Sequence, residues 1–140
     1  MKIVLDTNIL LVSISRKSAH HWIFKSLVDG HFTLCVTTDI LSEYAEIIEE
    51  HMNKDIADAV LLALLELSNV EKTEVYFKWN LLGDKDDNKF CDCVVAGGAN
   101  YLVTQDKDFS VLANTPFPKV SVLSLSQFKA VLAEQKSTEA

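Results

Sequence analysis

With 140 residues, the chain is long enough for one domain with its own core, and its 49% of hydrophobic residues argue against disorder. Its net charge of −7, from 20 acidic and 13 basic residues, disfavours a protein that binds nucleic acid through a broad basic surface. An enzyme that meets phosphates through a bound cation remains possible. No apolar stretch approaches the roughly 18 residues of a membrane span, and Asp6 interrupts the N-terminal apolar run. We therefore expect a cytoplasmic protein without a signal peptide and without contact to a membrane.

Short strands alternate with helical segments along the chain. Runs of β-forming residues predict strands at 2–5, 32–37, 101–104 and 120–123, and hydrophobic periodicity predicts helices at 19–29, 39–51, 54–67, 87–97 and 126–134. This alternation is typical of an α/β protein with a mainly parallel central sheet that helices cover on both faces. We expect a single domain over residues 1–135 and a frayed C-terminal tail over residues 136–140.

The helix predicted at residues 54–67 carries more leucines than a single core-facing stripe needs. One face contains Ala57, Leu61, Leu64 and Leu65, and Leu62 lies off it. Leu62 therefore indicates a second apolar surface, which would contact another subunit or a partner protein. The alternative is a helix that is buried on two sides within the domain.

Aspartates follow two of the predicted strands. Asp6 ends the first strand, and Asp106 follows the strand at residues 101–104. In open α/β sheets, ligands and metals bind beyond the carboxyl ends of the strands. We therefore expect these two strands to be parallel neighbours whose aspartates reach one site.

Polar residues beside these aspartates are candidates for a supporting role. Thr7 and Asn8 directly follow Asp6, and Thr104 can donate a hydrogen bond to a carboxylate or to a metal-bound water. Asp108 is a further candidate, but its position before the next apolar run favours a role as the cap of a short helix.

Helical phase selects Glu43 among the acids of the helix at residues 39–51. At 100° per residue, Glu43 lies roughly 100° from the centre of the apolar face, whereas Glu46 and Glu49 lie about 160° and 140° away. Glu43 therefore stands at the rim of the buried face, close to the helix start. A glutamate on the surface without a function is the alternative.

Further acids precede and begin the helix at residues 87–97. Asp84 suits a capping role, because helix N-termini favour carboxylates. Asp87 falls on the inward face of this helix, Asn88 lies at the edge of that face, and Asp92 points away from it. An inward carboxylate costs free energy unless a group such as a cation pairs with it. We therefore select Asp87 from this segment, with Asp84 or Asp92 as the fallback.

Carboxylates gathered at one site would repel one another unless they took up protons or held a divalent cation. Ligation by carboxylates without His or Cys suits hard ions, so Mg²⁺ or Mn²⁺ is the expected metal. Zinc is disfavoured because Cys35, Cys91, Cys93 and the four histidines lack paired ligand spacing. The odd number of cysteines also argues against a disulfide framework.

Four segments together resemble a PIN-domain ribonuclease, in particular the VapC-like toxin components of prokaryotic type II toxin–antitoxin modules. The segments are residues 4–8, 41–44, 84–90 and 101–109, and the resemblance extends from Ile3 to about Leu125. It implies a three-layer α/β/α sandwich and metal-dependent endonucleolytic cleavage of single-stranded RNA. It also implies a homo-oligomer and an antitoxin protein that blocks the site.

By this resemblance, the catalytic acids are Asp6, Glu43, Asp87 and Asp106, of which the three aspartates hold the metal. The spacing in many relatives would place the third acid on Asn88. In relatives with a run like residues 86–90, the aspartate before the asparagine serves instead, and that residue is Asp87 here. Helical phase selects the same residue.

Two other classes of protein share part of this pattern. A phosphatase of the haloacid dehalogenase type needs a second aspartate two residues after the first, where this chain has Asn8. The stronger alternative is a catalytically weak PIN-like module that regulates or docks RNA. The insecure third acid and the single arginine, Arg16, favour that alternative slightly.

Overall fold

The computed structural model describes the backbone of residues 1–139 and the side chains of residues 1–137. Its sheet consists of five short strands: β1 (Lys2–Leu5), β2 (Thr33–Val36), β3 (Val70–Lys72), β4 (Tyr101–Val103) and β5 (Val122–Leu123). The strand order is β3-β2-β1-β4-β5, and every neighbouring pair is parallel. Leu5 is paired with Val103, so β1 and β4 are parallel neighbours that end at the same edge, which confirms the prediction.

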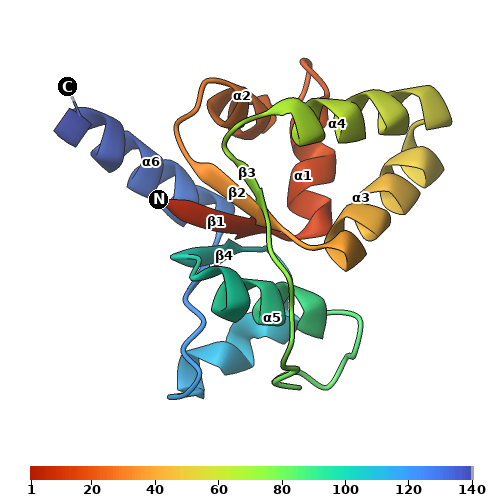
Figure 1. The fold of residues 1–140 in the computed structure, drawn as a ribbon. Helices are drawn as coiled ribbons and strands as arrows, with labels where there is room; N and C mark the ends of the chain where they lie inside the picture. The colour runs from red at the N-terminus through yellow and green to blue at the C-terminus, as the bar shows by residue number, and fades with distance from the viewer. Residues whose placement is uncertain (140) are drawn as a thin grey trace.

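Helices cover both faces of the sheet (Figure 1). One face carries α1 (Thr7–Ile14), α2 (His21–Val28), α3 (Thr38–His51), α4 (Lys54–Glu66) and α6 (Leu125–Glu139), and the other carries α5 (Asn88–Gly97) and the 3₁₀ helix η1 (Lys107–Asn114). This arrangement is the predicted three-layer α/β/α sandwich. Within the described residues, no helix is both long and apolar enough to cross a membrane.

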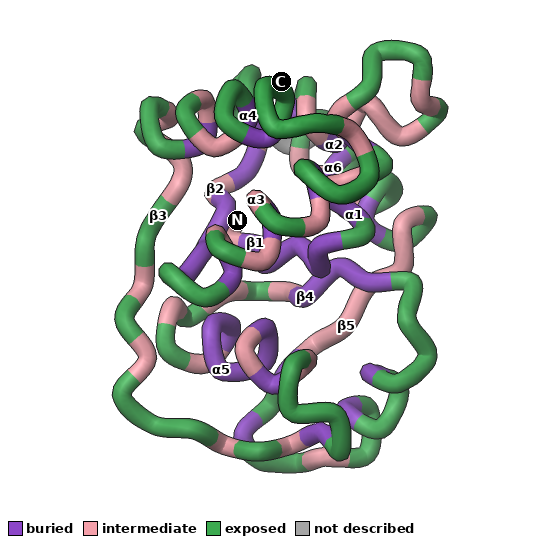
Figure 2. Tube along the Cα trace, turned by 90° about the vertical axis from the view of Figure 1, so that its right-hand side faces the viewer, coloured by how far each residue is buried: buried purple, intermediate pink, exposed green. Residues whose placement is uncertain are grey.

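The core lies where the central strands meet the inner faces of the helices (Figure 2). Ile3, Val4 and Leu5 of β1 are fully buried, because β1 is the middle strand and both of its faces are covered. On the far side of the sheet, α5 buries an apolar face that includes Phe90 and Val94. Gly98 ends α5 in the left-handed conformation, at φ 64°, which glycine adopts without steric cost.

Two elements of the structure were not predicted from the sequence. Helix α1 contacts both α2 and α3 and is therefore apolar on several sides. For this reason its sequence shows no clear helical period. Strand β3 is a three-residue edge strand with two exposed residues, too short and too polar to be recognised.

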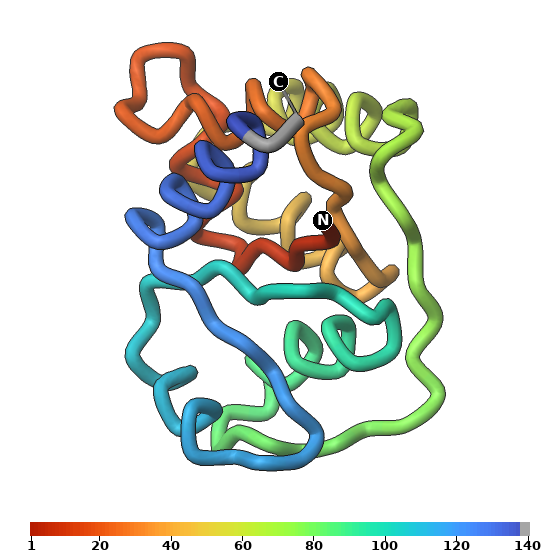
Figure 3. The backbone as a smooth tube through the Cα atoms, turned by 90° about the vertical axis from the view of Figure 1, so that its left-hand side faces the viewer, coloured from red at the N-terminus to blue at the C-terminus, as the bar shows by residue number. Residues whose placement is uncertain are grey.

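Helix α6 is longer than predicted. It begins at Leu125 and includes residues 136–139, within the stretch that was expected to be a frayed tail, while Ala140 lies outside the described residues. The helix runs beside α2, where the Trp22 and Phe128 rings have centroids 5.8 Å apart (Figure 3).

Helix α4 exposes part of its apolar surface. Its buried stripe consists of Ala57, Val60 and Leu64, which face α3. Leu62 is 58% exposed, which agrees with its predicted place off the core face. Leu65 was predicted on the core face, and that prediction was wrong, because it is 64% exposed. It lies about 100° beyond Leu64 around the helix, on the solvent side.

Candidate metal centre

The first part of the site lies at the shared edge of β1 and β4. Asp6 immediately follows β1, and its side chain is 8% exposed. The Thr104 hydroxyl donates a hydrogen bond to Asp6 Oδ2 at 2.7 Å, and its oxygen accepts one from the Asp106 N–H at 3.0 Å. Thr104 therefore fixes the Asp6 carboxylate and the backbone of Asp106 relative to each other.

Three acids lie close enough to share one cation. Asp87, Asp106 and Asp108 each offer a carboxylate oxygen, and these oxygens lie within 4.8 Å of one another. Asp106, rather than Asp108, caps the helix η1, because Asp106 Oδ1 accepts a hydrogen bond from the Asp108 N–H at 2.9 Å. The prediction of a capping role for Asp108 was therefore wrong, and its carboxylate joins the acidic group instead.

Burial and like charges raise the pKa of two acids of the site. The pKa of Asp87 rises to about 6, first because of desolvation and then because of the charges on Asp84, Asp106, Asp6 and Asp108. Desolvation also raises the pKa of Asp6, although hydrogen bonds from Thr104 and the Thr7 backbone oppose the shift. Carboxylates that resist ionisation in this way have a favourable partner in a divalent cation.

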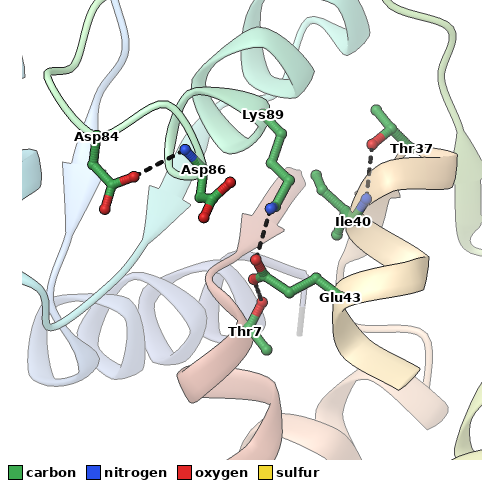
Figure 4. Close-up of polar contacts among 7 residues, drawn as sticks. All are labelled: Thr7, Thr37, Ile40, Glu43, Asp84, Asp86 and Lys89. Atoms are coloured by element: carbon green, nitrogen blue, oxygen red, sulfur yellow. Dashed lines mark hydrogen bonds and ion pairs between the residues drawn. The ribbon is translucent and has the colours of Figure 1, made fainter. Parts of the chain in front are cut away.

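Glu43 has contacts of its own, because its side chain extends from α3 to Thr7 of α1 and Lys89 of α5 (Figure 4). Its Oε2 accepts a hydrogen bond from the Thr7 hydroxyl, and its Oε1 forms an ion pair with Lys89 Nζ at 2.6 Å. The neighbouring Tyr44 is buried and donates its hydroxyl to the Leu5 carbonyl at 2.5 Å, which holds α3 against the end of β1. As helical phase indicated, Glu43 is half-buried and Glu46 is exposed.

Lys89 was not identified from the sequence. Its position directly after Asp87 and Asn88, in a first helical turn that faces the site, was the available signal. Its partner Glu43 lies 46 positions earlier in the chain, and a single sequence does not reveal pairs so far apart.

The other predicted residues around Asp87 have structural contacts. The buried Asn88 side chain accepts from the Leu82 N–H at 2.8 Å and donates to the Leu82 carbonyl at 3.2 Å, which closes the loop before α5. Asp84 is exposed and accepts from the Asp86 N–H at 2.9 Å (Figure 4). Asp92 was expected to point away from the buried face, but it is 5% exposed and accepts from the Trp79 N–H at 3.1 Å. The segment around Trp79 lies over this side of α5 and covers it.

Two cavities open beside the site. The larger, about 790 Å³, is polar, and its walls include Glu43, Asp92, Lys78, Lys85 and Lys89. The smaller, about 350 Å³, is lined by Asp6, Asn8, His20, Asp106 and four other residues. Asn8 is exposed there and forms part of the wall. Glu43 therefore lines one cavity, and Asp6 and Asp106 line the other.

The ligand set fits a hard divalent ion. The close group offers only carboxylate oxygens, and neither His nor Cys belongs to it. Mg²⁺ and Mn²⁺ prefer such oxygens and fill their remaining positions with water or phosphate oxygens. The electrostatic strain on Asp87 and Asp6 points in the same direction, because a cation would relieve it.

Residues 2–108 match the sequence model of the PIN domain. The match spans most of the chain and contains every acid described above, so the chain belongs to the PIN domain family. No curated protein sequence is significantly similar to it.

Solved structures with the same fold include VapBC2, VapC20 and Utp24. VapBC2 from Rickettsia felis, solved bound to a DNA fragment from its promoter, is 18% identical, with a TM-score of 0.59 and coverage of 89% of this chain and 98% of the other. VapC20 from Mycobacterium tuberculosis, a toxin that cleaves the sarcin–ricin loop, is 16% identical, with a TM-score of 0.59 and coverage of 78% and 93%. The PIN domain endonuclease Utp24 is 17% identical, with a TM-score of 0.52 and coverage of 88% and 84%. At these identities the likeness shows a shared fold.

Proposed function

We propose that the chain is an endoribonuclease that depends on Mg²⁺ or Mn²⁺ and cleaves single-stranded RNA in the cytoplasm. The observation that carries the proposal is the group of Asp87, Asp106 and Asp108, whose carboxylate oxygens lie within 4.8 Å of one another beside Asp6. Membership of the PIN domain family and the fold shared with nucleases support it.

The residues of the site have distinct roles in this proposal. Asp6, Asp87 and Asp106 would hold the ion, with Asp108 as an additional ligand, and Thr104 keeps Asp6 and the backbone of Asp106 in place. A bound ion would lower the pKa of a coordinated water and offset the charge that develops on the phosphate oxygens.

Glu43 orients the attacking water towards phosphorus. The new bond joins that water oxygen to phosphorus, and the bond from phosphorus to the 3′ oxygen breaks. The attacking water gives up a proton to solvent, and the departing 3′ oxygen takes one from solvent. The products are a 5′-phosphate and a 3′-hydroxyl, because water and not the ribose 2′-hydroxyl attacks.

Cleavage of a single-stranded oligoribonucleotide in Mn²⁺ tests the proposal. Asp6→Asn and Asp106→Asn should each lower the rate at least about a hundredfold, because each removes a charge that holds the ion. Glu49→Gln, on the solvent face of α3 and in the wall of neither cavity, is the control and should be near neutral. Full activity in EDTA, or products with 2′,3′-cyclic phosphate ends, would refute the mechanism. Metal binding without cleavage would favour a regulatory or RNA-docking module.

We also propose that the chain is the toxin of a toxin–antitoxin pair and that it associates with itself. The shared fold with VapBC2 and VapC20 supports a toxin, and the exposed leucines of α4 support a protein partner. Leu62 and Leu65 together place apolar surface in water, which is a common feature of interfaces.

A further inference from the structure

We propose that the Lys89 ammonium takes the place of a second metal ion beside Glu43, so that the site binds a single divalent ion. This inference rests on the metal-dependent site proposed above and specifies its stoichiometry. It makes Lys89 a positioning residue that acts through Glu43.

The contacts of Glu43 are the first support. One carboxylate oxygen accepts from Thr7 and the other forms the ion pair with Lys89 at 2.6 Å, so each oxygen already has a donor (Figure 4). The side chains of Lys89 and Glu43 are only 20% and 24% exposed. A charge pair that is this close and this sheltered from water is weakly screened.

The position of Glu43 relative to the other acids is the second support. The close group that could hold an ion contains Asp87, Asp106 and Asp108, and among the described residues neither Glu43 nor Asp6 is part of it. Asp6, however, shares a cavity with Asp106 and is tied to it through Thr104, whereas Glu43 lines the other cavity. Glu43 nevertheless lies near enough to Asp6 to raise the pKa of that carboxyl group. The site therefore has two negative regions, and Lys89 supplies the positive charge of one of them.

The local structure of α5 directs Lys89 to this place. Asn88 is fixed by its two hydrogen bonds to Leu82, so the first turn of α5 has a defined orientation. From this turn, Asp87 reaches the acidic group, whereas Lys89 reaches Glu43. The Lys89 ammonium also lies 5.7 Å from the centre of the Phe90 ring, a second favourable contact for its charge.

The charge of Lys89 opposes a second ion. A divalent cation that bound Glu43 would have to displace the ammonium or lie next to it, and like charges at that distance repel. Without the ammonium, Glu43 would keep only its hydrogen bond from Thr7, and its uncompensated charge beside an acidic group would attract a second cation.

Counting the Mn²⁺ ions that bind to the RNA-free protein tests the inference without any cleavage assay. Electron paramagnetic resonance of unbound Mn²⁺ gives the number of ions per chain. We expect one ion for the unaltered protein and two for Lys89→Met, which keeps the length of the side chain and removes its charge. Lys89→Arg keeps the charge and should still bind one. Lys89→Gln replaces the methionine variant if that variant does not fold.

Glu43→Gln tests whether a second ion in the Lys89 variants binds to the Glu43 carboxylate or results from a general change in the fold. Alone, it should leave the count at one, because Glu43 is not a ligand of the first ion in this proposal. Combined with Lys89→Met, it should remove the second ion. Two ions in the unaltered protein, or one ion in both neutral variants of Lys89, would overturn the inference and leave the nuclease proposal standing. No bound ion in the unaltered protein would overturn both.

Discussion

Asp87 is an acid whose surroundings favour its neutral form. Its pKa of about 6 lies well above the usual 3.8, mainly because of desolvation and the charge of Asp84. The folded chain therefore binds this proton more tightly than the unfolded chain does. The cost of the charge is absent below about pH 4 and complete above about pH 6, so the stability of the metal-free protein falls across this window as the pH rises.

Asp87→Asn should therefore stabilise the metal-free protein at pH 7.5. The full shift corresponds to about 3 kcal/mol, and the exposure of the group reduces this to on the order of 1 kcal/mol, or roughly 3–5 °C in melting temperature. The difference from the parent should disappear by about pH 4. Thermal melts in EDTA at several pH values measure it, with Glu49→Gln as an exposed control. A constant difference at every pH would show that charge is not the cause.

Metal binding by Asp6 and Asp106 can be measured through the melting temperature of the protein. A cation that binds only the folded state raises the melting temperature, so the parent should melt higher in Mn²⁺ than in EDTA. Asp6→Asn and Asp106→Asn should lose that rise while remaining at least as stable as the parent in EDTA, because each removes one of several like charges. An equal rise in parent and variants would remove these residues from the set of ligands.

At the scale of elements, the loop between Leu82 and α5 controls where Asp87 lies. The loop is closed by the paired hydrogen bonds between the Asn88 side chain and the Leu82 backbone, and both residues are at least nine-tenths buried. A buried backbone group that loses its partner costs about 1–3 kcal/mol. The Asn88 amide therefore ties the start of the loop to the start of α5, next to Asp87.

Asn88→Ala should destabilise the protein by about 1–3 kcal/mol and weaken Mn²⁺ binding, because Asp87 loses its fixed position. Urea unfolding gives the first quantity, and the melting shift in Mn²⁺ gives the second. Asn114→Ala, at an exposed position in η1, is the matched control. If Asn88→Ala lost stability but kept full metal binding, the loop would not be what positions Asp87.

Part of the arrangement of strands and helices is predictable from the sequence. The sequence predicts that β1 and β4 are neighbours, because an aspartate follows each strand and a shared site requires both strands to end at one edge of the sheet. The structure pairs these strands, and Asp6 and Asp106 line one cavity. The phase of α3 identifies Glu43. Helical phase gave the wrong burial for Asp92 and Leu65, because the elements that pack against a helix decide which of its faces are buried. The segment around Trp79 covers Asp92, while nothing in the described residues covers Leu65.

At the scale of the whole molecule, the candidate site and the exposed part of α4 are separate. The acids lie at the carboxyl edge of the sheet, whereas α4 contacts α3 on the outside of the helical layer (Figure 1). A change on the outer face of α4 can therefore alter assembly without touching the acids. Neither Leu62 nor Leu65 belongs to the hydrophobic core among the described residues.

The double variant Leu62→Glu and Leu65→Glu should fold with near-normal stability, within about 0.5 kcal/mol, and lose its protein partner. Light scattering reports self-association, and co-purification with the product of a neighbouring gene reports an antitoxin. Val111→Glu, an exposed apolar position in η1, is the control. The toxin–antitoxin pair would be established by two results. The parent arrests growth and co-expression of the neighbouring gene relieves the arrest, whereas the double variant still arrests growth when the neighbour is co-expressed. A strictly monomeric parent with no co-purifying protein would remove the interface proposal.

The three cysteines have a practical consequence for experiments with this protein. Cys35, Cys91 and Cys93 are buried, and burial raises the pKa of all three thiols, to about 12 for Cys91 and Cys93. The thiolate is the reactive form, so maleimide reagents at neutral pH should leave the native protein unlabelled. A cysteine introduced at the exposed Ser110, two residues after Asp108, would then be the only labelled position. A dye attached there would report the arrival of metal and RNA in real time, with every acid of the site intact.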